Sequence, residues 1–265
     1  MRTRRLSPAI VAVAAIALGL LVLPLVALAV RAPWGHLPQL VASSVVLQAL
    51  GLSLLTATLS TLMCLVFGIP LAIVLARAAD WPAVPRRLLR AAITVPLVLP
   101  PVVGGIALLM LLGRRGLIGR FLADAGLGIP YTSGAVVIAQ VFVAMPFLVF
   151  AVEGALRTAD RRTELAAATL GASRFDTFRL VTVPLVAPGI AAGAVLCFTR
   201  ALGEFGATIT FAGSLPGVTR TLPIASYLAL QTDPEAAIAL ALVLLVVSVA
   251  VLLLLRDRWL PGMRG

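Results

Sequence analysis

The chain has 265 residues, of which 61% are hydrophobic and 12% are charged. This composition excludes a soluble globular domain and predicts an all-α polytopic membrane protein, because charge is costly to bury in lipid. The net charge is +11, yet all 21 basic residues are Arg, and the absence of Lys excludes both a P-loop and a lysine nucleophile.

Six apolar runs are long enough to cross a bilayer, whose hydrocarbon core of about 30 Å takes about 20 helical residues. The first run follows Arg2, Arg4 and Arg5. Its length of about 22 residues exceeds the roughly 7 to 15 residues of a signal-peptide core, so we expect an uncleaved span. The expected spans are residues 9–30, 46–76, 91–112, 133–152, 186–211 and 236–255.

The second run carries a stripe of hydroxyl side chains: Ser53, Thr56, Thr58, Ser60 and Thr61. Such residues either satisfy neighbouring helices or line a polar path, and both interpretations stay open here.

The third run holds several residues that disturb a helix, namely Pro96, Pro100, Pro101, Gly104 and Gly105. They predict a kinked or broken helix. Irregular backbone at membrane depth is tolerated only against protein or a polar cavity, so this run is a candidate wall of a translocation path. A packing kink between tight helices is the alternative.

The arginines predict how the spans are oriented. The two ends of the chain and the loops within residues 77–90 and 157–179 hold 15 of them, whereas the opposite loops hold 5. Because positive residues accumulate on the cytoplasmic side, both termini and residues 157–184 are expected there. This orientation explains the high charge without nucleic acid. Three outer arginines depart from the rule, and we expect them to form an anion-attracting mouth: Arg114, Arg115 and Arg120.

Metal binding is not expected. The chain has one histidine, His36, and two cysteines, Cys64 and Cys197, which cannot build a usual structural zinc site. Both cysteines lie inside apolar runs, where we expect them to pack as small hydrophobic residues.

The fifth run places Arg200 and Glu204 one helical turn apart, near or beyond the middle of the membrane. An unpaired charge there costs at least about 2.5 to 3.5 kcal/mol, so we expect the two to pair with each other or across helices. The pair either locks helices together or belongs to a gate, and both interpretations stay open. The candidates for path or gate are Pro100, Pro101, Gly104, Arg200, Glu204, Gly206 and Thr208.

Between the fourth and fifth runs lies the charged stretch ELAAATLGASRFDTFRLVTVP, residues 164–184. The three alanines favour a short helix that stops at Gly171, and residues 172–180 are expected to form a second helical piece. The stretch resembles the EAA loop of the membrane subunits of ABC importers. Ala166, Ala167, Gly171, Val181, Val183 and Pro184 fall at the matching spacings.

One position departs from the EAA pattern, because Leu165 stands where the pattern has Glu and Glu164 comes one residue earlier. In that family the short helix docks in a cleft on the ATPase subunit, so the resemblance implies the same role here. It assigns to this coupling loop, within residues 157–184, Glu164, Ala166, Ala167, Gly171, Ala172, Phe175 and Pro184.

Two further stretches narrow the resemblance. Both are similar to the molybdate branch of these permeases, which is related to the sulfate systems. The first stretch lies in the fifth run and reads CFTRALGEFGATITFAG, continuing through FAGSLPGVTRTLPIASY. The second lies in the third run and reads PLVLPPVVGGIALL, followed by GRRGLIG. The resemblance implies the type I ABC importer permease fold, with a permease core in residues 46–265 that follows an amino-terminal tail, first span and outer loop in residues 1–45.

The resemblance also implies how such a subunit works. It implies import of molybdate, or of tungstate, through a homodimer in the cell membrane. A separate cytoplasmic ATPase subunit would carry ATP and Mg, so this chain itself would be non-catalytic and bind no cofactor, and an extracytoplasmic binding protein would deliver the oxyanion. The alternatives are a sulfate or thiosulfate permease and, in another class, a secondary anion transporter driven by an ion gradient.

Overall fold

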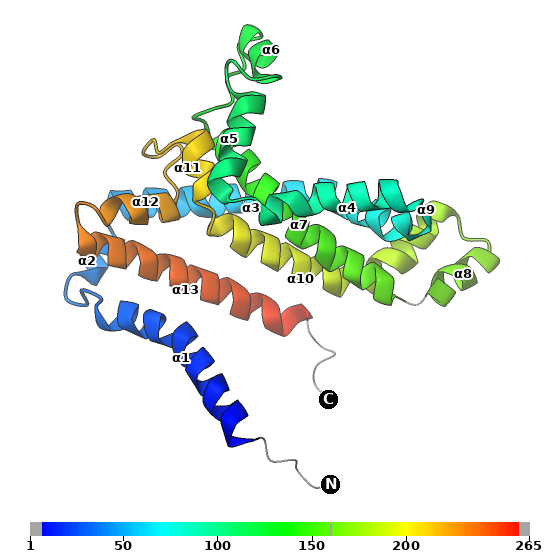
Figure 1. Cartoon of the computed structure of the whole chain (residues 1–265), viewed down its shortest axis with the longest axis horizontal. Coiled ribbons are helices and arrows are strands. Elements are labelled where there is room, and N and C mark those ends of the chain that lie inside the picture. Colours follow the sequence, from blue (N-terminus) through cyan, green and yellow to red (C-terminus); the bar gives the residue numbers. More distant parts are fainter. Residues whose placement is uncertain (1–6, 160, 260–265) are drawn as a thin grey trace.

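A computed structural model describes residues 7–159 and 161–259, and every regular element within them is a helix. Four long helices lie side by side along one direction (Figure 1): α3 (Ser44–Arg77), α7 (Ser133–Thr158), α10 (Val183–Leu202) and α13 (Pro234–Trp259). The first span, α1 (Pro8–Val30), buries none of its side chains and diverges from this bundle, to which the short helix α2 (Leu37–Val41) connects it.

The expectation of about six spans is confirmed. Among the described residues, five stretches are long and apolar enough to cross a membrane, and a bent pair of helices adds a sixth if it counts as one span. The five straight candidates are Pro8–Val30, Ser44–Asp80, Ser133–Thr158, Phe175–Leu202 and Pro234–Val251. The second of them continues from α3 through a short 3₁₀ turn, η1 (Ala78–Asp80).

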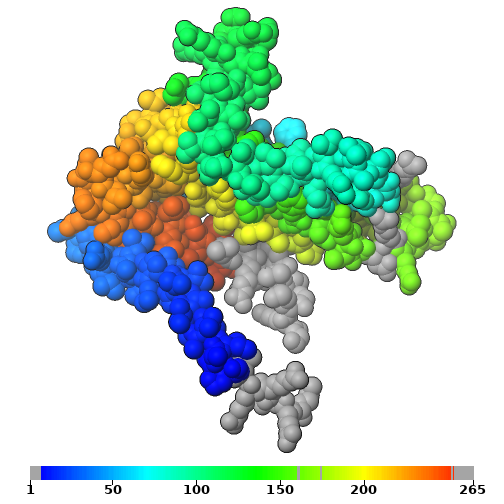
Figure 2. Space-filling view, in the orientation of Figure 1, coloured from blue at the N-terminus to red at the C-terminus, as the bar shows by residue number. Residues whose placement is uncertain are grey.

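The bent pair is the proline-rich third run, which is broken as its sequence predicts. Helix α4 (Ala83–Val98) and helix α5 (Pro101–Leu112) meet at an angle change of 115°. Leu99 and Pro100 are extended, with ψ of 135° and 132°, because a residue that precedes proline avoids the helical region. Helix α5 therefore leaves the bundle sideways and carries α6 (Gly119–Asp124) at its tip (Figures 1 and 2).

The fifth span differs from its predicted bounds of 186–211. Helix α10 ends at Leu202, and a separate short helix, α11 (Gly206–Ala212), follows. The break leaves backbone N–H groups at the start of α11 without a helical partner, and the Glu204 carboxylate accepts that of Ala207 at 2.8 Å. At the other end, α9 (Arg174–Thr177) and a π turn, η2 (Phe178–Thr182), run without interruption into α10. The piece expected at residues 172–180 is thus the beginning of the span, and α12 (Leu222–Ala229) lies in the connection between α11 and α13.

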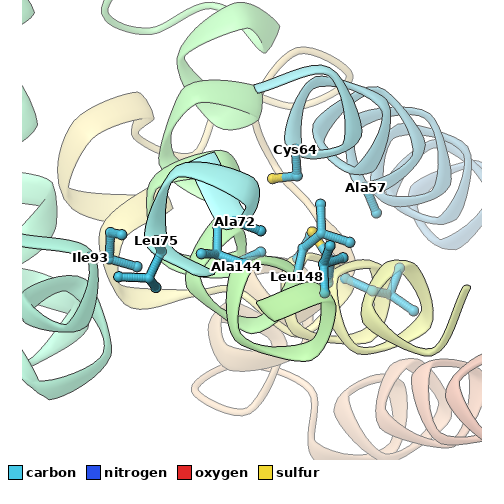
Figure 3. Close-up of a cluster of buried hydrophobic side chains, with 12 residues drawn as sticks. Ala57, Cys64, Ala72, Leu75, Ile93, Ala144 and Leu148 are labelled. Atoms are coloured by element: carbon cyan, nitrogen blue, oxygen red, sulfur yellow. The ribbon is translucent and has the colours of Figure 1, made fainter. Parts of the chain in front are cut away.

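The core lies where α3, α7 and α10 meet (Figure 3). Small side chains bring these helices close together, as in other membrane bundles. A Cβ added at Gly193 would lie 3.0 Å from side chains of Leu148 and Ala151. Cys64 and Cys197 are free and fully buried in this cluster, which confirms that they pack as small hydrophobic residues.

Three hydroxyl side chains of α3, those of Ser53, Thr56 and Ser60, are buried and favour the packing interpretation, whereas Thr58 is exposed and bonds within its own helix. Ser60 donates to the Gln140 side-chain oxygen at 2.8 Å, and the Gln140 amide donates to Thr56 at 3.2 Å. Ser53 accepts the backbone N–H of Leu222, at the start of α12, at 2.7 Å. These buried groups therefore join α3 to α7 and α12 rather than face a path.

Candidate translocation path and coupling segment

The break between α4 and α5 lies against the break between α10 and α11. A Cβ at Gly206, the first residue of α11, would lie 2.8 Å from the Pro101 Cβ at the start of α5. A Cβ at Gly105 would lie 2.7 Å from the Ala207 carbonyl oxygen, and one at Gly104 would lie 2.9 Å from the Phe142 ring. Helix α5 is therefore wedged between α11 and α7, and only glycine fits at these contacts.

Arg200 and Glu204 form the ion pair that the sequence predicts. Their Nη1 and Oε2 atoms are 2.6 Å apart, and the Glu204 side chain is 1% exposed whereas that of Arg200 is 27% exposed. The other Glu204 oxygen accepts the Ala207 N–H, so the carboxylate has two partners. The pair thus lies at the point where α10 stops and α11 begins.

Thr208 completes the set of residues that the sequence places at a path or gate. Its hydroxyl is fully buried in α11 and, within the described part of the chain, has no hydrogen-bond partner. The structure brings Pro101, Gly206, Glu204 and Arg200 together around the two breaks, with Pro100 as the residue that caps α5. Their role in transport stays a prediction.

The three arginines that are expected on the outer side are exposed but lie apart from this junction. Arg114 and Arg115 follow α5, and Arg120 lies in α6 with its guanidinium 4.5 Å from the Phe121 ring centroid. Helix α5 has 12 residues, about 18 Å, between the junction at Pro101 and these arginines. A mouth formed by them is therefore separate from the Arg200–Glu204 pair.

The EAA-like stretch forms a short helix, a turn and a second helix. Helix α8 (Arg161–Thr169) ends in a Schellman motif in which the Ala172 and Gly171 N–H groups bond to the Ala167 and Ala168 carbonyls at 3.1 Å. Gly171 has a φ of +86°, the left-handed conformation that favours glycine. This confirms the helix end that the sequence predicts there.

Glu164 closes this segment onto the next helix. Its carboxylate accepts the Thr182 hydroxyl at 2.6 Å, so α8 is tied to the π turn that opens the fifth span. A cleft of about 560 Å³ lies beside that contact, lined by Arg77, Glu164, Ala168, Ala172, Phe175 and Phe178. Leu165, Leu170 and Phe175 are exposed, as are Ala166 and Pro184.

Sequence reasoning missed a second buried carboxylate, Glu153 near the end of α7. It forms ion pairs with Arg90 of α4 and, at 2.9 Å, with Arg157 of α7. A signal was present, because a single Glu at the end of an apolar run is followed one turn later by Arg. The partner on α4 could not be predicted, since that contact depends on how the helices pack.

Comparison with known proteins identifies the family. Residues 68–261 match the family described as "Binding-protein-dependent transport system inner membrane component". The Molybdenum transport system permease protein ModB of Mycobacterium tuberculosis (strain H37Rv) is 52% identical over 217 residues, which cover 82% of this chain and 81% of that protein. The protein of the same name from Escherichia coli (strain K12) is 43% identical over 214 residues, which cover 80% and 92%.

A solved structure agrees at the level of fold. The crystal structure of a bacterial alginate ABC transporter, in complex with an alginate pentasaccharide-bound periplasmic protein, contains a chain that superimposes with a TM-score of 0.69. The match covers 94% of this chain and 92% of that one at 18% identity, so it shows the type I ABC importer permease fold. The chain is therefore a multi-pass membrane permease that belongs to the binding-protein-dependent transport system inner membrane components, among the molybdenum transport system permeases.

Proposed function

We propose that the chain is the transmembrane subunit of an ATP-driven importer that moves molybdate into the cytoplasm, with tungstate as the further oxyanion to test. The identity of 52% with a molybdenum transport permease over most of both chains carries the proposal. The match to the wider family spans residues 68–261. This range includes both broken spans and the EAA-like loop of residues 157–184, which we call the coupling segment.

The Arg200–Glu204 pair supports an anion as the substrate. Arg200 is partly exposed, whereas Glu204 is buried and has a second partner in the Ala207 N–H. When the guanidinium turns toward a passing oxyanion, the carboxylate keeps that backbone hydrogen bond and is not left without a partner. Arg200 can thus offset the charge of a dianion at membrane depth, where an unpaired charge is costly.

The coupling segment supports an ATPase partner that carries ATP and Mg on the cytoplasmic side. Its exposed Leu165, Leu170 and Phe175 offer apolar side chains to another protein, and Glu164 connects the segment to the fifth span by a hydrogen bond. Motion of the partner would reach α10 through this contact. In this arrangement both termini are cytoplasmic, the chain itself is non-catalytic, and it lies in the cell membrane as one of two identical copies.

An extracytoplasmic binding protein completes the proposed importer. The exposed Arg114, Arg115 and Arg120 lie at the tip of the arm formed by α5 and α6, which stands clear of the bundle (Figure 2). A positive tip of this kind attracts an oxyanion that a binding protein releases nearby.

Oxyanion uptake by proteoliposomes tests the proposal. They would hold this chain with the proposed ATPase and binding-protein partners, and uptake of molybdate, tungstate and sulfate would be compared with and without ATP. We expect ATP-dependent molybdate uptake that excess sulfate does not inhibit. Competition by sulfate at similar concentrations would make the chain a sulfate permease, and uptake by this chain alone without ATP would make it a secondary transporter.

A further inference from the structure

A carboxylate between two arginines joins helix α7 to helix α4. The Glu153 side chain, 5% exposed, forms ion pairs with Arg90 of α4 and Arg157 of α7, whose side chains are about half exposed. The Arg90 guanidinium also lies 5.8 Å from the Phe150 ring centroid, over the same helix. We call Arg90, Glu153 and Arg157 the inner ion cluster.

Helix α4 has few other attachments to the bundle. Ile93 is its one buried residue among 16, and Leu89 is partly buried against the same core. Leu89, Arg90 and Ile93 fall within a single turn and a half, so α4 contacts the bundle over a short stretch. Outside it, Arg86 donates a hydrogen bond to the Ala79 carbonyl. The ion pair at Arg90 is thus a large part of what holds α4 in place.

The inner ion cluster lies between two parts of the molecule that transport has to connect. Glu153 is five residues from the end of α7, and beyond that end the chain leads to α8 of the coupling segment. Helix α4 leads in the other direction to the 115° break and to α5, which packs on α11 beside Arg200 and Glu204. The coupling segment therefore has two connections to the break, one through Glu164 and α10 and the other through Glu153 and α4.

We propose that Glu153 is a positioning residue through which α7 moves α4, so that displacement of the coupling segment by the ATPase changes the angle of the α4–α5 break. This inference rests on the proposed function, since it assumes an ATPase partner. The second arginine makes the contact releasable. When Arg90 separates from Glu153, Arg157 stays on the same helix and keeps the buried carboxylate paired.

The first test compares transport with ATP hydrolysis in the reconstituted complex of this chain with its ATPase and binding protein. In Arg90→Gln and Glu153→Gln we expect the molybdate imported per ATP hydrolysed to fall about fivefold or more, a typical size for coupling between sites. The double variant should fall no further than either single variant, because both remove one interaction.

Two matched variants distinguish the loss of the Arg90–Glu153 contact from a general loss of positive charge on α4. Arg90→Lys keeps the charge and should restore most of the coupling. Arg87→Gln removes the same charge from the exposed face of α4 and should leave the ratio unchanged. If uptake and ATPase activity instead fall in parallel with the amount of assembled complex, Glu153 is structural only and the inference is wrong.

A second readout needs no transported substrate. Val98, at the end of α4 beside the break, is 77% exposed, so a Val98→Cys variant can report on its movement through the rate of thiol labelling, while both native cysteines are buried. We expect ATP to change that rate at least about threefold in the parent complex and not in Glu153→Gln, as a coupled two-state element requires. This result would support the inference even for a sulfate importer. If ATP drives uptake by the parent complex but does not change the rate of thiol labelling at Val98→Cys, the inference is wrong and the proposed function still stands.

Discussion

Each of three carboxylates in this chain joins two elements. Glu204 connects the end of α10 to the start of α11, Glu164 connects α8 to the π turn, and Glu153 connects α7 to α4. The sequence predicts the pairing of Arg200 with Glu204, because charge at membrane depth has to be neutralised. It does not predict that Glu204 also caps α11, since that bond exists only because the span breaks there.

The Arg200–Glu204 pair should be asymmetric in its effect on stability. Arg200→Gln leaves Glu204 at 1% exposure with the neutral Ala207 N–H as its remaining partner. Loss of one partner from a buried ion pair costs about 3 to 5 kcal/mol, and this hydrogen bond should keep the cost near the lower value. Glu204→Gln leaves the charge on Arg200, whose side chain is 27% exposed and so less buried, and its cost should be smaller. Thermal unfolding of the purified variants measures this order, and a larger loss in Glu204→Gln would contradict it.

Gly171 should be required for its conformation rather than for space. A Cβ there meets no atom within 4 Å, but the φ of +86° strains residues other than glycine. Gly171→Val should therefore weaken co-purification of the ATPase while membrane insertion persists, because the strain costs on the order of 1–3 kcal/mol. Gly171→Asn is the matched control, since Asn tolerates the left-handed region. Equal co-purification for both variants and the parent would remove the docking role.

The two broken spans differ in how visible they are in the sequence. Pro100 and Pro101 predict the break between α4 and α5, because proline lacks a backbone N–H and restricts the conformation of the residue before it. Gly203 and Gly206 mark the break between α10 and α11 much less clearly. A glycine in an apolar run is typical of close helix packing as well as of a helix end, and here Gly206 serves both purposes.

The contact between α5 and α11 should not tolerate an added methyl group. Gly105→Ala would place its Cβ 2.7 Å from the Ala207 carbonyl oxygen, and overpacking of this kind costs about 1–3 kcal/mol. We expect reduced uptake and a lower unfolding temperature. Gly51→Ala, in α3 with no atom within 4 Å, should be neutral or slightly stabilising. If the two variants behave alike, the close approach of α5 to α11 is wrong.

At the scale of the whole molecule, the approximate number of spans could be predicted from apolar length, whereas the bounds of the third and fifth spans differ from the prediction. The direction of α5 could not be predicted. The prolines predict a break, but the 115° angle depends on the helices against which α5 packs. The same holds for the coupling segment. Its helix and its turn at Gly171 were predictable from local residues, whereas the contact of Glu164 with Thr182 joins positions 18 apart and needed the fold.

The arm formed by α5 and α6 holds Arg114, Arg115 and Arg120 away from the bundle, where their charges can attract an oxyanion through the solvent. Replacing Arg114, Arg115 and Arg120 together by Gln should slow uptake about tenfold at an ionic strength of about 0.01 M, the lower end of the range for electrostatic steering. At about 0.15 M the difference should nearly vanish, because the screening length falls to about 8 Å. The triple Lys variant keeps the charge and is the control. Equal slowing at every salt concentration would exclude steering.

The packing of α5 on α11 also has a consequence for biosynthesis. Gly105 emerges from the ribosome about a hundred residues before Ala207, the residue on which it packs. At about 5–20 residues per second, that delay lasts roughly 5 to 20 seconds. During this interval the apolar arm has been translated but lacks the helix that receives it, so a nascent chain that stops short of α11 presents an unfinished span to the quality-control machinery of the membrane.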